Sequence, residues 1–214
     1  MGAEGGARAD PASLTDRLLQ GLGCEGIAAC DEFLTPVELK DLIECAHTRR
    51  ERGDFLEARI GSGRELRHRP DIRGDSICWL AEPLLAPERG ILERLERIRI
   101  ALNRSAYLGL SELEAHYAWY PPGAGYAPHV DQLRGGRHRR VSLIVYLNED
   151  WRCPDDGGLL RCVADDGGDR LIAPVGGRLV AFMTEGREHE VRSTRRARLS
   201  ITAWFLGCQG SMLR

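Results

Sequence analysis

Hydrophobic residues recur at helical spacing in three segments of the first half of the chain. Leucines over residues 14–22 predict a short amphipathic helix. The sequence Thr-Pro-Val-Glu is a capping box that opens a second helix, which we expect over residues 36–50. Apolar positions over residues 87–104 predict a long third helix. Residues 1–12 are rich in Gly, Ala and charge, and we expect a disordered tail there.

The second half of the chain changes to short apolar runs separated by Gly, Pro, Asp and Asn. Helices followed by many short strands predict a mainly β fold with supporting α-helices, packed as a barrel or sandwich. We expect one domain over residues 13–214, with helical support and a lid loop in 13–105 and the β core in 106–207. The strands are expected over residues 77–80, 113–119, 141–147, 159–163, 170–173, 178–183 and 198–205.

Two arginine-rich segments each have two interpretations. Residues 60–75 are polar and irregular, so they form either a solvated connection or a loop over a functional site. The arginines over residues 134–140 mark either a solvated loop or a docking surface for an acidic peptide.

Composition narrows the classes of partner. Thirty basic and thirty-two acidic residues among 214 give a net charge of −2, so we expect neither a nucleic-acid nor a membrane partner. The start of the chain lacks the apolar core of a signal peptide, and no run of about eighteen apolar residues follows, which predicts a cytoplasmic protein. Seven cysteines without a Cys-x-x-Cys pair indicate reduced thiols. We expect a monomer.

Three side chains form a candidate metal site. In an extended strand, residues i and i+2 point to the same side, so His129 and Asp131 can bind one ion together. His189, just after an apolar strand, is the candidate third ligand. Two histidines and one carboxylate are the ligands of non-haem Fe(II) oxygenases, which keep other coordination positions open. Taken singly, His129 and Asp131 also fit a surface turn, and His189 also fits an ordinary strand histidine.

An arginine follows the third candidate ligand at a suggestive distance. Arg198 lies nine residues after His189, inside the last expected strand. A guanidinium there can face the same cavity and bind a dicarboxylate through two hydrogen bonds. Such a dicarboxylate could be 2-oxoglutarate.

With these four residues in order, the chain resembles the 2-oxoglutarate- and Fe(II)-dependent dioxygenases, and among them the prolyl 4-hydroxylases of the hypoxia-inducible-factor type. The likeness extends from about residue 71 to residue 205. It implies a double-stranded β-helix, or jelly roll, as the core of the fold. The matching segments are Asp71-Ile-Arg-Gly-Asp75 with Trp79, Tyr120-Pro leading to Gly125-Tyr126, His129-Val-Asp131, Tyr146-Leu-Asn-x-Asp-Trp151, Gly157-Gly-x-Leu160-Arg, His189-Glu-Val191, and Arg198 to Trp204.

The resemblance also implies a role for each matching residue. His129, Asp131 and His189 would hold the iron, and Arg198 would pair with the distal carboxylate of 2-oxoglutarate, aided by Tyr146. The residues lining the cosubstrate site would be Tyr120, Thr202, Ile144, Leu160 and Val191. The residues that contact or enclose a peptide substrate would be Arg73, Asp75, Arg139, Trp204 and Tyr126. Three of these aromatic residues, Tyr126, Tyr146 and Trp204, also fit core positions of strands.

Three departures from the family pattern concern the substrate. Ser200 stands where the hypoxia-type enzymes have a small apolar residue, although Arg-x-Ser is common in the wider superfamily. His116 replaces an apolar residue near the metal pocket. The loop after Asp131 is one residue longer.

The resemblance implies a peptidyl-prolyl 4-hydroxylase that uses Fe(II), 2-oxoglutarate and dioxygen and releases succinate and carbon dioxide. Ascorbate is the expected reductant, and oxygen sensing an expected role. The substrate would be a proline in a partner protein, such as elongation factor Tu or a hypoxia-factor-like target. The alternatives are a hydroxylase of a free amino acid or biosynthetic intermediate, a nucleic-acid demethylase, and a binding module without turnover. Demethylases carry a second arginine where this chain has Trp204.

Overall fold

The computed structural model describes residues 11–61, 67–131 and 138–207. Residues 1–10 of the tail expected over residues 1–12, the longer loop after Asp131 and most of the arginine cluster lie outside these ranges. Helix α1 (Pro11–Cys24) begins inside the segment expected to be a tail. No helix among the described residues is both long and apolar enough to cross a membrane.

The predicted second and third helices are confirmed as α2 (Pro36–Glu51) and α3 (Ala86–Ala106). The capping box at the start of α2 is present, because the Thr35 hydroxyl accepts from the Glu38 N–H and the Glu38 carboxylate accepts from the Thr35 N–H. The N–H groups at the start of a helix have no acceptor within the helix, and these two side-chain oxygens supply acceptors for two of them.

Two antiparallel sheets form the core, which confirms the expected jelly roll with supporting helices. Four strands, β1, β2, β5 and β10, have no counterpart among the strands expected from the sequence. The larger sheet has the order β1 (Ile27–Cys30), β9 (Leu179–Met183), β6 (His138–Tyr146), β11 (Arg198–Gly207), β4 (Leu110–Tyr120), β3 (Ser76–Trp79) and β2 (Leu56–Glu57). The smaller sheet has the order β5 (Tyr126–His129), β10 (His189–Val191), β7 (Leu160–Val163) and β8 (Asp169–Ile172).

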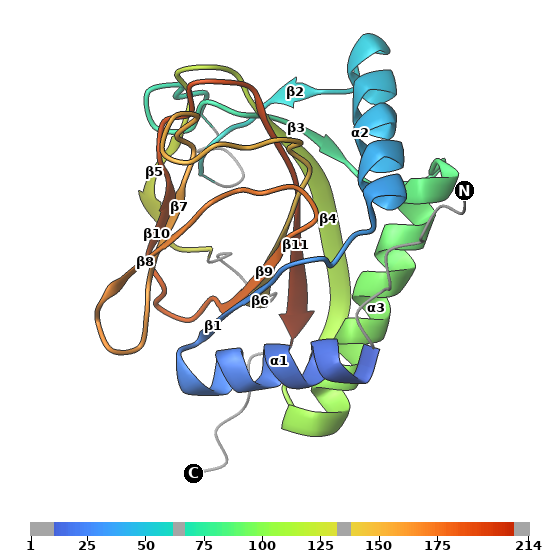
Figure 1. Ribbon diagram of the computed structural model, residues 1–214, viewed down its shortest axis with the longest axis vertical. Helices are drawn as coiled ribbons and strands as arrows, with labels where there is room; N and C mark the ends of the chain where they lie inside the picture. Colours follow the sequence, from blue (N-terminus) through green and yellow to red (C-terminus); the bar gives the residue numbers. More distant parts are fainter. Residues whose placement is uncertain (1–10, 62–66, 132–137, 208–214) are drawn as a thin grey trace, which may run out of the picture.

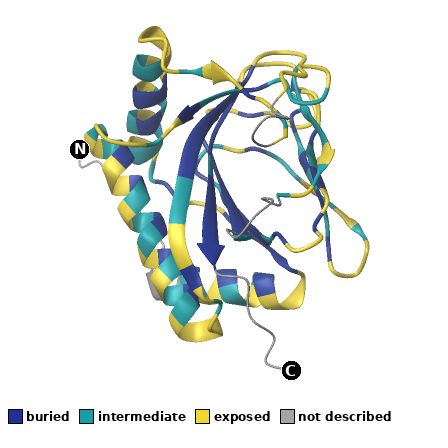
Figure 2. Cartoon of the chain, turned by 180° about the vertical axis from the view of Figure 1, so that it is seen from behind, coloured by how far each residue is buried: buried dark blue, intermediate teal, exposed yellow. Residues whose placement is uncertain are grey.

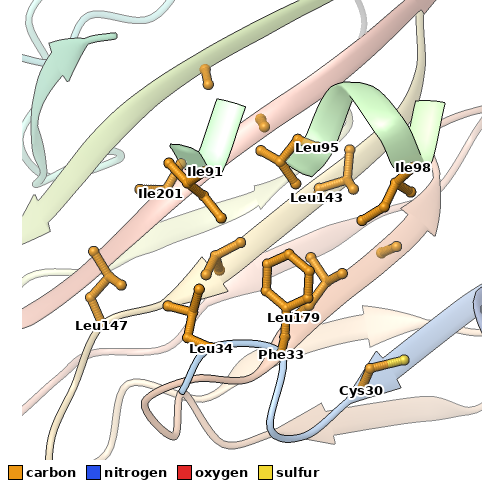
Figure 3. Close-up of a cluster of buried hydrophobic side chains, with 14 of the residues drawn as sticks. Cys30, Phe33, Leu34, Ile91, Leu95, Ile98, Leu143, Leu147, Leu179 and Ile201 are labelled. Atoms are coloured by element: carbon orange, nitrogen blue, oxygen red, sulfur yellow. The ribbon is translucent and has the colours of Figure 1, made fainter. Parts of the chain in front are cut away.

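The helices cover one face of the larger sheet, and the smaller sheet lies on the other side (Figure 1). Alternate residues of each central strand therefore face different surroundings. On β11, Leu199 and Ile201 join the core beneath the helices, where Leu95 of α3 packs on the sheet (Figure 3). The intervening residues of β11, from Arg198 to Trp204, face the space between the sheets. Burial follows this division, with the central strands buried and the outer helix faces exposed (Figure 2).

Candidate functional site

A cavity of about 360 Å³ lies between the two sheets. Fourteen of the fifteen site residues expected from the sequence line it, and the fifteenth, Tyr146, lies directly beside Arg198. The fourteen are Arg73, Asp75, Tyr120, Tyr126, His129, Asp131, Arg139, Ile144, Leu160, His189, Val191, Arg198, Thr202 and Trp204. The cavity also includes Arg59, Ile60 and Gly61 from the start of the arginine-rich loop. That part of the loop therefore borders the site.

Strand pairing brings the three candidate metal ligands together. His129 ends β5 and lies directly opposite His189, the first residue of β10, while Asp131 follows two residues after β5. Possible ligand atoms of all three lie within 4.8 Å of one another. The Nε2 atoms of His129 and His189 are 3.8 Å and 3.5 Å from the Asp131 carboxylate oxygens. This spacing suits three ligands around one divalent ion.

The backbone orients both histidines for metal binding. Nδ1 of His129 donates to the Ala127 carbonyl at 2.8 Å, and Nδ1 of His189 donates to the Arg187 carbonyl at 3.2 Å. Because a carbonyl oxygen only accepts, Nδ1 carries the proton and Nε2 keeps its lone pair. Burial, together with the neighbouring His189, lowers the pKa of His129 to about 4, so this imidazole is neutral at neutral pH.

Two further residues hold the carboxylate, and one of them has no signal in the sequence. Ser142 on β6 and Trp204 on β11 donate to the same Asp131 oxygen at 2.7 Å and 2.8 Å. Burial raises the pKa of this carboxyl, but the two histidines and these two donors outweigh it and hold the pKa below its usual range. Asp131 is therefore a carboxylate ready to bind a cation. Only the pairing of β6 with β11 places Ser142 here.

The far end of the cavity offers a buried positive charge. Arg198 is 1% exposed, and it forms no ion pair with any residue in the described ranges. Its Nε donates to the Gly158 carbonyl at 3.1 Å, while no residue that the structure describes is a partner for Nη2. The rings of Tyr120 and Tyr146 lie on either side, each centred 5.1 Å from the guanidinium carbon.

Two other buried polar atoms at this end also lack partners within the described ranges. They are the hydroxyl oxygens of Tyr146 and Ser200. Burial raises the pKa of Tyr146, so its hydroxyl stays protonated and can donate. Leaving a buried cation and two hydroxyls unsatisfied costs several kcal/mol. A carboxylate entering from the cavity would satisfy all three groups, which fits the distal end of 2-oxoglutarate.

Charged and aromatic residues form the other end of the cavity. Arg73 donates two hydrogen bonds to the buried Asp75, at 2.7 Å and 3.0 Å, and its guanidinium lies over the Tyr126 ring. Arg139 lies over the Trp204 ring, with the guanidinium carbon 3.4 Å from the ring centre. These contacts fix the side chains before any substrate arrives.

A family model described as the 2OG-Fe(II) oxygenase superfamily matches residues 115–206. The structure also resembles a solved Pseudomonas putida prolyl-4-hydroxylase, with a TM-score of 0.81 and 34% identity, covering 91% of this chain and 99% of that one. The chain belongs to the 2OG-Fe(II) oxygenase superfamily. Fe(II) and 2-oxoglutarate are thus the metal and cosubstrate supported by both the family and the triad of this oxygenase.

Other relatives of the oxygenase are animal proteins. Human Egl nine homolog 1 is 30% identical over 190 residues, which are 84% of this chain and 43% of the human protein. The oxygenase thus spans about half the length of the human, rat and mouse Egl nine homolog 1 proteins that it matches. A prolyl hydroxylase from Trichoplax adhaerens, solved with a hypoxia inducible factor peptide, has the same fold, with a TM-score of 0.82 at 24% identity.

Proposed function

We propose that this oxygenase is a peptidyl-prolyl 4-hydroxylase that acts on a proline in a partner protein. The proposal is supported by the likeness to the Pseudomonas putida prolyl-4-hydroxylase over nearly its whole length. It is also supported by the Egl nine homologues, although the chain spans only about half of these. Elongation factor Tu and hypoxia-factor-like proteins are the targets that the family resemblance suggests.

The observation that carries the proposal is the pairing of two partial sites in one cavity. At one level, His129, Asp131 and His189 present ligand atoms within 4.8 Å of one another. At the far end, Arg198 presents a buried guanidinium nitrogen that has no partner in the part of the chain that the structure describes. In our proposal the first three residues hold Fe(II), and Arg198 with Tyr146 holds the distal carboxylate of 2-oxoglutarate.

When bound, Fe(II) and 2-oxoglutarate would supply the oxidation: 2-oxoglutarate and dioxygen would be converted to succinate and carbon dioxide, with one oxygen atom entering succinate and the other a substrate C–H bond. The protein orients the reactants and keeps water away. Arg198 and Tyr146 set the direction of the diacid, and the hydroxyls of Tyr120 and Thr202 offer further hydrogen bonds near the metal. The apolar wall between these groups consists of Ile144, Leu160 and Val191.

The peptide would lie across the charged and aromatic end of the cavity. Arg73 and Asp75 form a fixed ion pair there, and Arg139 covers the Trp204 ring. Tyr126 stacks on the His129 ring at 3.5 Å between centroids, so it connects this end to the metal ligands. We propose that these five residues contact or enclose the substrate. Trp204 donates to Asp131 and leaves no place for the second arginine of a nucleic-acid demethylase.

The proposal is tested with short acetylated and amidated peptides, each with one central proline, alongside free proline. With Fe(II), 2-oxoglutarate and air, we expect succinate and a peptide one oxygen atom heavier, and amino-acid analysis should give 4-hydroxyproline. His189→Ala is the inactive control. Turnover of free proline or another small molecule, with no peptide modified, would replace the proposal by the small-molecule hydroxylase.

Several expectations remain predictions that rest on this proposed function. They are a requirement for ascorbate over many turnovers, a role in oxygen sensing, a cytoplasmic location, and a monomer without nucleic-acid or membrane partners. The dependence of the peptide hydroxylation rate on ascorbate and on dioxygen concentration tests the first two.

A further inference from the structure

His116 is a buried histidine that the metal and cosubstrate sites do not use. It lies on β4, is 2% exposed and lines the cavity. Strand pairing places it opposite Thr202 on one side and Trp79 on the other. An apolar side chain would fill this position without the cost of burying an imidazole. The polar atoms of His116 therefore need an explanation.

The hydrogen-bonding state of the ring follows from one contact. Nδ1 lies 3.0 Å from the Tyr117 carbonyl oxygen, which can only accept, so Nδ1 carries a proton. Burial lowers the pKa of His116 to about 4, so the ring is neutral at neutral pH and Nε2 has a lone pair. Within the described part of the chain, Nε2 has no hydrogen-bond partner. A donor for it can come from the cavity.

Two tryptophans hold the ring in place. The Trp79 ring meets it edge-on, with centroids 5.1 Å apart, and the Trp204 ring lies 5.2 Å away. Trp79 is 49% exposed, while Trp204 donates to Asp131. His116 thus lies between the solvent-facing Trp79 and a residue that touches a metal ligand.

The cosubstrate cannot be the donor. Both carboxyl groups of 2-oxoglutarate are ionised at neutral pH, so its oxygens accept hydrogen bonds and none donates. His116 lies four residues before Tyr120, the strand partner of Arg198, and beside Trp204 at the charged and aromatic end of the cavity. The donor for Nε2 is therefore expected from a substrate.

The charges nearby select a neutral donor. His116 is 2% exposed, and two acids at this end of the cavity are already paired, Asp75 with Arg73 and Glu114 with Arg139. A lysine or arginine of the substrate would lose its hydration at Nε2 without gaining either of these carboxylates as a partner. The neutral donor that every peptide supplies is a backbone N–H, and because a proline nitrogen in a peptide carries no hydrogen, the donor must belong to a neighbouring residue.

We propose that Nε2 of His116 accepts a hydrogen bond from the backbone N–H of a residue next to the target proline, and so sets how the peptide lies over the metal site. This inference rests on the proposed function. His116 acts in it as a specificity-determining residue and takes no part in binding the metal or the diacid.

The test combines peptide and protein changes. The peptide most readily hydroxylated by the wild type is made with one N-methyl group at each position in turn, and kcat/KM is measured for the wild type, His116→Met and His116→Gln. One methylation next to the proline should lower kcat/KM of the wild type about tenfold more than that of His116→Met. His116→Gln keeps an acceptor and should restore much of this difference. Titration should show the affinity for 2-oxoglutarate unchanged in His116→Met.

The outcomes distinguish a failure of the proposed hydrogen bond from a failure of the proposed prolyl hydroxylase function. Equal losses on methylation in the wild type and His116→Met would overturn the hydrogen bond and leave prolyl hydroxylation standing. A weaker affinity of His116→Met for 2-oxoglutarate would mean that the residue shapes the cosubstrate site instead, which also overturns the inference. If the wild type hydroxylates none of the peptides, the proposed function fails and the inference fails with it.

Discussion

Ser142→Ala removes a single hydroxyl from the support of the proposed iron site. Ser142 is fully buried on β6, and its Oγ donates to the Asp131 carboxylate at 2.7 Å. The substitution creates little space and leaves the strand pairing of β6 intact. It therefore isolates the hydrogen bond from the fold.

The expected magnitude follows from the charge of the acceptor. A hydrogen bond to a charged group contributes about 1.5–3 kcal/mol, or about 10- to 100-fold in a dissociation constant. Residues that support metal ligands have effects in this range. Trp204 still donates to the same oxygen at 2.8 Å in the variant, so we expect the lower end, about tenfold weaker Fe(II) binding. Without Ser142 the pKa of Asp131 also rises, so protons compete better with the metal.

The assay is an anaerobic calorimetric titration of the metal-free protein with Fe(II), compared between wild type and variant. Ser111→Ala is the matched control, because its hydroxyl donates to the backbone carbonyl of Leu206 and not to a metal ligand. The control should bind Fe(II) as the wild type does. An affinity of Ser142→Ala within about twofold of the wild type would refute the role assigned to this hydroxyl.

Four other substitutions test the rest of the site. His189→Ala should abolish both Fe(II) binding and succinate release, and full turnover would remove it from the metal ligands. Arg198→Ala should raise the KM for 2-oxoglutarate by at least about tenfold while Fe(II) still binds, as steady-state kinetics and titration would show. Asp75→Ala should lower peptide hydroxylation, measured by mass spectrometry, more than uncoupled 2-oxoglutarate consumption; equal losses would contradict its substrate role. His116→Met should flatten the pH dependence of stability. The pKa of His116 is about 4 when folded and about 6.5 when unfolded, so the unfolded chain binds the extra proton between these values. The free energy of unfolding therefore decreases as the pH is lowered, by about 1.6 kcal/mol from pH 6.5 to pH 5 for this group, and urea titrations of both proteins would measure the difference.

The fold and most of the cavity residues could be predicted from the sequence, because both depend on the alternation of apolar and polar residues along the strands. In β11, apolar and polar residues alternate from Arg198 onward, and the apolar set faces the helices. Helix α2 was predictable because its cap is a local interaction between Thr35 and Glu38. The histidines and Asp131 were identified by residue type and order, and pairing of β5 with β10 brings them together.

What could not be predicted depends on contacts between distant segments. Strand β10 has three residues and β2 has two, which is too short for a periodic pattern. Asp131 lies after β5 ends, so its place beside His129 comes from the donors on β6 and β11 and not from strand geometry alone. Ser142 is an ordinary serine in the sequence. Its function is visible only when β6 lies beside β11.

We propose that one cavity holds both ligands, with iron at the His129–Asp131–His189 triad and the diacid at Arg198. Crystals grown without oxygen, with Mn(II) in place of Fe(II) and with 2-oxoglutarate, test it most directly through the anomalous signal of the metal. We expect one metal peak within coordination distance of His129, Asp131 and His189, and a carboxylate of the diacid on Arg198. A metal peak elsewhere, or a diacid bound away from Arg198, would contradict it.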